Sequence, residues 1–63
     1  MELEEFPPEE RARLYRWRAM EARAEAQRIV DPELKSGFIR LARNWEELAS
    51  NLEQEIAKRR SNL

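Results

Sequence analysis

The segment Ile29-Val30-Asp31-Pro32-Glu33 interrupts a chain that reads as helix on both sides of it. Asp31 is a residue type favoured just before a helix, and Pro32 suits the first helical position, where its missing N–H is not needed. The proline ring also disfavours the helical conformation at Asp31. Asp31 and Pro32 are therefore the predicted turn and cap. Since the connection is so short, we expect two antiparallel helices lying side by side.

The first helix is predicted over residues 7–30 and the second over residues 32–60, with 31–32 as the turn. Pro7-Pro8 can begin a helix but cannot lie within one, and the acidic pair that follows suits a helix N-terminus. Residues 1–6 are an expected acidic lead-in and residues 61–63 a tail, so the whole chain is one domain. Gly37 costs about 1 kcal/mol relative to alanine inside a helix. It serves a close backbone approach or is incidental.

Apolar residues recur on both predicted helices in alternating steps of three and four, the spacing of shallow, coiled-coil-like packing. Folding the chain back at 31–32 sets small residues of the first helix against large residues of the second. Such pairing fills the space between facing layers without voids. The predicted hairpin core consists of Ala12, Tyr15, Ala19, Ala22, Ala26, Ile29, Leu34, Phe38, Leu41, Trp45, Leu48 and Leu52.

Further apolar residues lie outside this core. On the first helix they are roughly opposite the core stripe at ~100° per residue, and on the second they lie beside it. A helix that is apolar on two faces often has two neighbours, so we expect an interface with a second copy or another protein. The candidate interface residues are Leu14, Trp17, Met20, Ala24, Ala42, Ala49 and Ile56. Trp17 is the expected anchor. The alternative is that Trp17 and Leu14 are simply half-exposed beside arginine stems.

The composition favours self-association. The chain has 63 residues, of which 40% are charged and 41% hydrophobic, and it contains neither cysteine nor histidine. A helical pair of this size buries too little apolar surface to be comfortably stable alone, and disulfides and thiolate–metal sites are excluded. Two hairpins related by a twofold axis would form an antiparallel four-helix bundle. The expected fold is therefore an all-α hairpin that pairs with itself as a homodimer.

Several classes of function are excluded by the same composition. Without histidine or cysteine, no serine has an activating base, so we expect no enzyme, no cofactor, no metal site and no small-molecule substrate. The N-terminus lacks the apolar segment of a secretory signal, and no apolar run approaches the roughly 20 residues of a membrane span. A soluble cytoplasmic protein with no membrane partner is the expectation.

The segment Arg11–Arg18 holds four arginines and two aromatic residues, a composition that resembles a nucleic-acid-binding surface or one for an acidic partner. Helical spacing, however, scatters these arginines around the rod, and glutamates lie at salt-bridging separations from several of them. The net charge of −1 gives no general attraction to nucleic acid. A solvated, salt-bridged surface is the preferred interpretation. An acidic protein partner and nucleic acid are the alternatives.

Three motifs carry a resemblance: Tyr15-Arg16-x-Arg18-Ala19, Asp31-Pro32-Glu33 and Leu41-Ala42-x-x-Trp45-x-x-Leu48-Ala49. Together they resemble a group of short, uncharacterised alphaproteobacterial proteins over roughly residues 12–56. The resemblance implies a helical hairpin of bacterial origin. It brings no activity and no functional residues with it.

The leading functional hypothesis is a non-enzymatic interaction module that associates with itself through helix–helix packing. A monomeric hairpin that docks on a larger protein as an adaptor or inhibitor is the second hypothesis. A nucleic-acid-binding accessory that uses the Arg11–Arg18 cluster is the third.

Overall fold

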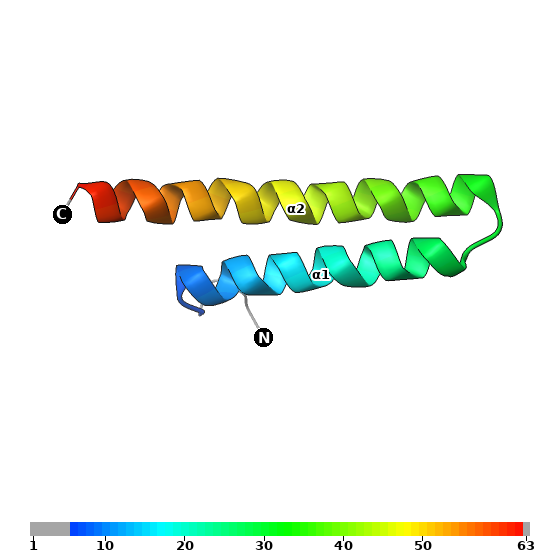
Figure 1. Ribbon diagram of the computed structural model, residues 1–63, viewed down its shortest axis with the longest axis horizontal. Coiled ribbons are helices and arrows are strands. Elements are labelled where there is room, and N and C mark those ends of the chain that lie inside the picture. Colours follow the sequence, from blue (N-terminus) through cyan, green and yellow to red (C-terminus); the bar gives the residue numbers. More distant parts are fainter. Residues whose placement is uncertain (1–5, 63) are drawn as a thin grey trace.

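The computed structural model describes residues 6–62 and shows two antiparallel α-helices joined by a short connection (Figure 1). Helix α1 spans Pro8–Arg28 and helix α2 spans Pro32–Ser61. The all-α helical hairpin predicted from the sequence is thereby confirmed. The predicted acidic lead-in falls almost entirely on residues 1–5, which lie outside the described residues.

Helix α1 begins at the proline pair. Pro7 occupies the N-cap position, Pro8 is the first helical residue, and the N–H of Arg11 donates to the Pro7 carbonyl at 3.0 Å. The helix ends at Arg28, two residues before the predicted boundary, because Ile29 already has extended backbone (φ −89°, ψ 128°). Facing helix axes are about 8–10 Å apart, and crossing that distance requires extended residues. Helix α2 continues one residue beyond the predicted end, to Ser61.

The turn depends on backbone conformation more than on a capping side chain. Asp31 occupies the N-cap position of α2 with extended backbone (φ −64°, ψ 120°), but its carboxylate makes no capping hydrogen bond. The first helical bond runs instead from the N–H of Lys35 to the Asp31 carbonyl, at 2.9 Å. We attribute the turn mainly to Pro32, which excludes Asp31 from the helix. The side-chain cap expected of Asp31 is absent.

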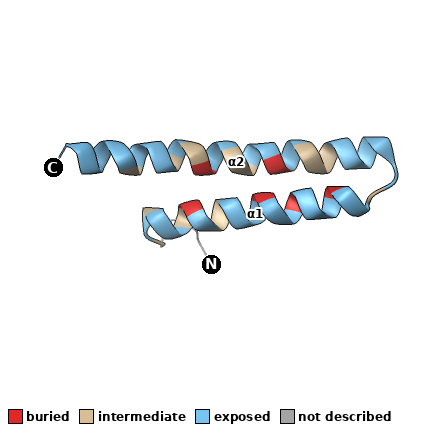
Figure 2. Cartoon of the chain, viewed as in Figure 1, coloured by how far each residue is buried: buried red, intermediate tan, exposed pale blue. Residues whose placement is uncertain are grey.

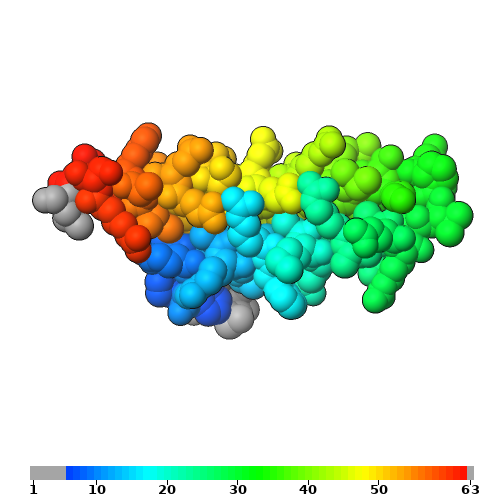
Figure 3. Space-filling model, viewed as in Figure 1, coloured from blue at the N-terminus to red at the C-terminus, as the bar shows by residue number. Residues whose placement is uncertain are grey.

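The buried residues line the seam, where the two helices face each other (Figure 2). Within residues 6–62, every buried residue is an alanine: Ala12, Ala19, Ala22, Ala26, Ala42 and Ala49. Ala42 and Ala49 are 0% exposed. The molecule measures 49 × 24 × 13 Å, so it is a single layer one helix thick. Side chains fill the gap between the ribbons along α1, and the C-terminal part of α2 extends past the start of α1 (Figure 3).

Part of the predicted core is wrong. Leu34, Leu41 and Leu48 are 54%, 43% and 47% exposed, and the seam positions assigned to Leu41 and Leu48 are held by Ala42 and Ala49. The remaining large members of the predicted core are half-buried: Tyr15, Ile29, Phe38, Trp45 and Leu52. Ile39, which was not predicted to be in the core, is also half-buried.

The rotation of α2 explains this difference. The row Phe38, Trp45 and Leu52 lies between a row of leucines on one side and the alanine row on the other. Facing alanines let the two backbones approach closely, which increases dispersion contacts along the whole seam. Turning the leucine row toward α1 would also turn Glu46 and Glu53 away from the arginines that they bind.

Candidate functional site

The seam divides the hairpin into two unlike faces. On α2, Trp45 follows the buried Ala42 by three residues and Glu46 follows it by four. At 100° per residue, Trp45 lies about 60° to one side of the seam and Glu46 about 40° to the other. The same relation holds one heptad further on, around Ala49. One face is therefore apolar and the opposite face is charged.

The charged face carries two interhelical ion pairs, each formed by two hydrogen bonds. Arg16 donates from Nη2 to Glu53 Oε1 at 2.8 Å and from Nε to Oε2 at 3.2 Å. Arg23 donates from Nε to Glu46 Oε2 at 2.7 Å and from Nη2 to Oε1 at 2.9 Å. Two parallel bonds give such pairs geometric specificity. They are solvent-exposed, so they contribute little stability and mainly fix the register of the helices.

A third pair continues the same row. Arg60 Nη2 lies 3.8 Å from Glu9 Oε1, seven residues away from the previous pair on each helix. The interhelical ion pairs thus recur once per heptad along the charged face.

Hydrogen bonding shifts the titration of these groups. The bond from Arg16 lowers the pKa of Glu53, partly offset by desolvation, and the bond from Arg23 lowers the pKa of Glu46 in the same way. The same bonds raise the pKa of Arg16 and Arg23 above the ordinary arginine value. All four side chains are therefore charged at neutral pH.

The Arg11–Arg18 cluster does not form one surface. Arg16 turns to Glu53 on the charged face, whereas Arg18 lines the opposite face, where its Nη1 lies 3.4 Å from Glu21 Oε1. Arg11 is half-buried, and its Nε has no hydrogen-bond partner among residues 6–62. The arginines are thus distributed around α1.

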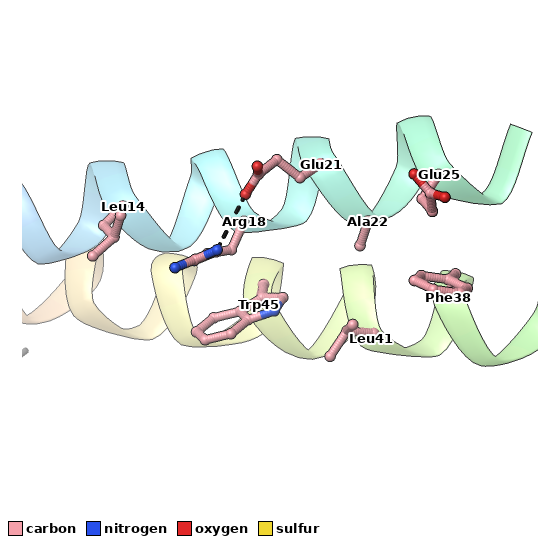
Figure 4. A pocket seen from close by; sticks show the side chains of 8 residues that line it. All are labelled: Leu14, Arg18, Glu21, Ala22, Glu25, Phe38, Leu41 and Trp45. Atoms are coloured by element: carbon pink, nitrogen blue, oxygen red, sulfur yellow. Dashed lines mark hydrogen bonds and ion pairs between the residues drawn. The ribbon is translucent and has the colours of Figure 1, made fainter. Parts of the chain in front are cut away.

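The apolar face contains a groove between the two helices (Figure 4, where α1 is drawn above α2). The lining residues are Leu14, Arg18, Glu21, Ala22 and Glu25 from α1, and Phe38, Leu41 and Trp45 from α2. The buried methyl group of Ala22 leaves room between the larger side chains around it. The groove therefore combines an apolar wall on α2 with a charged rim on α1.

Two features extend this apolar surface beyond the groove. Trp45 packs against Tyr15 of α1, with ring centroids 5.6 Å apart and planes tilted by 30°. Leu34 and Leu48 lie one heptad before and after Leu41, so all three leucines share one side of α2. Contiguous exposed apolar surface commonly marks an interaction site.

Only one of the four interface residues predicted on α1 lines the groove. Of the strip on α1, Leu14 lines the groove, whereas Trp17 and Met20 are 57% and 62% exposed and do not line it. Ala24 is also exposed and outside the groove lining.

The interface residues predicted on α2 lie within the hairpin or are half-buried. Ala42 and Ala49 are buried between the helices of one hairpin and are unavailable to a second chain, which corrects that assignment. Ile56 is half-buried. Sequence reasoning missed the exposed leucine row, although the seven-residue spacing of Leu34, Leu41 and Leu48 is visible in the sequence.

Residues 6–62 contain no group of three or more acidic, histidine or cysteine side chains placed to hold a metal ion. Within the same range, neither helix is long and apolar enough to cross a membrane. Comparison of the chain with models of protein families, with curated proteins and with solved structures found no match. The groove and the leucine row are therefore the features from which a function can be argued.

Proposed function

We propose that the protein is a non-enzymatic interaction module that associates with itself through the apolar face of the hairpin, forming a homodimeric four-helix bundle. One observation carries this proposal. Within residues 6–62 no side chain larger than alanine is buried, and the large apolar side chains of α2 remain half-exposed on one face. A single hairpin thus lacks the core that its composition could build.

The energetics favour a second layer. Complete burial of a leucine or phenylalanine side chain contributes about 1.5–3 kcal/mol. Leu34, Leu41, Leu48, Phe38 and Trp45 realise only part of this contribution in a layer 13 Å thick. Domains are ordinarily built from two packed layers around one core. A second hairpin stacked on the apolar face would supply the missing layer.

Charge and chemistry agree with this proposal. The net charge of −1 leaves little long-range repulsion between two copies. Glu46 and Glu53, the carboxylates nearest the seam on the charged face, are occupied by arginines, so they are poorly suited to acid–base catalysis.

The test is the mass of the protein in solution, measured by sedimentation over a wide range of concentrations. We expect a dimer that dissociates on dilution. Leu41→Glu places a charge on the groove wall at a position that is 43% exposed in the hairpin. It should weaken association by about 2 kcal/mol or more, the scale of an interface hot spot, while circular dichroism shows the helices intact.

The matched control is Met20→Glu, which adds the same charge to an exposed position outside the groove lining. This variant should associate like the wild type. A wild-type chain that stays monomeric at every concentration would refute self-association. The same face would then be the docking surface for a different protein.

A further inference from the structure

The groove has a self-complementary layout. On α1, Arg18 and Glu25 lie toward opposite ends of the groove, seven residues apart, with Glu21 and Ala22 between them. On α2, Trp45 lies at the Arg18 end and Phe38 at the Glu25 end, with Leu41 between them (Figure 4). Each end therefore pairs one charge with one aromatic ring, and the two ends carry opposite charges.

A twofold axis that crosses the helices at right angles between Ala22 and Leu41 exchanges the two ends. In an interface built on such an axis, a patch meets its own copy in reverse. Arg18 of one hairpin then lies against Glu25 of the second, and Leu41 lies against Leu41. Because the leucines are spaced evenly by seven residues, Leu34 of one copy falls beside Leu48 of the other. One axis thus brings Arg18 to Glu25 and also aligns the leucine row of α2. Glu21, the third charged lining residue of α1, lies near the axis and keeps its contact with Arg18 of its own copy.

We propose that two hairpins stack groove to groove about this axis, with their turns at opposite ends and with Arg18 of each copy paired to Glu25 of the other. This orientation rests on the proposed self-association and adds the geometry of the interface to it.

The other twofold stacking is less favourable. An axis parallel to the helices would place α1 of one copy over α2 of the other, with both turns at the same end. Arg18 and Glu25 would then be covered by the leucine row and its uncharged neighbours Gly37 and Asn44. Charges that lose water without gaining a partner are costly. Glu25 forms no ion pair with any residue in 6–62, and Arg18 has only its 3.4 Å contact to Glu21, so both can accept new partners.

Charge reversal tests the orientation. Arg18→Glu alone, or Glu25→Arg alone, brings like charges together at both symmetry-related contacts and should weaken dimerisation at least about tenfold. An equimolar mixture of the two variants should form a heterodimer with nearly wild-type affinity, because both contacts become attractive again. Arg13→Glu, an exposed reversal outside the groove lining, is the control and should leave affinity unchanged.

The outcomes separate the two proposals. If both single variants dimerise like the wild type and the mixture shows no preference for the heterodimer, the orientation is wrong while self-association stands. If the wild type does not dimerise at all, the proposed function fails and the orientation fails with it.

Cysteine crosslinking gives a second measurement, since the chain has no cysteine of its own. Leu41→Cys places the two thiols next to each other at the axis, within reach of a disulfide, and should form a covalent dimer on mild oxidation. Leu48→Cys is the matched control, because two such positions lie about 21 Å apart along the interface at 1.5 Å per residue. Equal crosslinking by both variants would overturn the proposed axis.

Discussion

Alanine at the seam determines how closely the two helices approach. Ala42 and Ala49 are fully enclosed by the facing helix, although each buries only a methyl group. They stabilise the hairpin less through the area that they bury than by letting the helices come close together. The two backbones are then in dispersion contact. A larger side chain at either position must push the helices apart or adopt a strained rotamer.

Ala42→Leu should therefore destabilise the hairpin by ~1–3 kcal/mol, the usual range for overpacking. Thermal unfolding followed by circular dichroism measures the effect. Ala57→Leu is the matched control on the same helix, because Ala57 is exposed. Its effect should stay within about 0.5 kcal/mol. Equal melting temperatures for the two variants would show that Ala42 does not limit the helix separation.

The surroundings of Gly37 show whether a close backbone approach requires glycine at this position. A Cβ atom built at this position meets nothing within 4 Å, and the backbone there is ordinary helix. No close backbone approach inside the hairpin requires glycine at this point. The alternative that Gly37 is incidental to the hairpin is therefore favoured.

At the scale of the helices, the sequence predicts where they turn more securely than which side each one buries. Pro32 and the proline pair at 7–8 act locally, so their consequences can be read from neighbouring residues. On α2, the leucine row and the alanine row lie on either side of Trp45, and either row could face α1. Hydrophobicity alone favours Leu41 and Leu48 for the seam.

The observed side of α2 goes with the close approach of the facing alanines and with the register set by the interhelical ion pairs, and neither is evident from the pattern of one helix alone. Glu46 and Glu53 meet Arg23 and Arg16 only when the alanine row faces α1. The groove could not be predicted for the same reason, since it exists only when Leu41 stands beside the seam. Both Leu14 and Leu41 line the groove, but the interface predicted from the sequence included only Leu14.

The same ion pairs predict how stability depends on pH. The lowered pKa of Glu46 and Glu53 means that their pairs contribute fully above the ordinary glutamate pKa of about 4.3. That contribution is lost as the pH falls through the lowered values of the folded state. The melting temperature should therefore fall between pH 5 and pH 3, and the double variant Glu46→Gln, Glu53→Gln should show a smaller fall.

The control for this measurement is Glu47→Gln, which removes an exposed carboxylate that forms no ion pair with any residue in 6–62 and lies outside the first turn of α2. It should keep the pH dependence of the wild type. If the double variant and Glu47→Gln give the same profile, the interhelical pairs contribute nothing measurable to stability. Raising the salt concentration should reduce the difference between the wild type and the first variant, because exposed pairs are screened.

For the whole molecule, the absence of large buried side chains among residues 6–62 leads us to expect that folding is coupled to the proposed self-association. If the second layer completes the core, the folded state is stabilised by mass action, and the melting temperature should rise with protein concentration. Differential scanning calorimetry at several concentrations measures this directly. The melting temperature of Leu41→Glu should depend less on concentration than that of the wild type. A wild-type melting temperature that does not change over a hundredfold dilution would contradict the coupling.

The two tryptophans lie on different surfaces, so their intrinsic fluorescence can report on each surface. Trp45 lines the groove and lies against Tyr15 at 5.6 Å, close enough for efficient energy transfer from tyrosine to tryptophan, whereas Trp17 is largely open to water. Emission from Trp45 should therefore respond to anything that covers the groove. Trp17 should respond to the solvent around α1. Replacing either tryptophan with phenylalanine would leave a single tryptophan, so events on the two surfaces could be followed separately by tryptophan emission without an added dye.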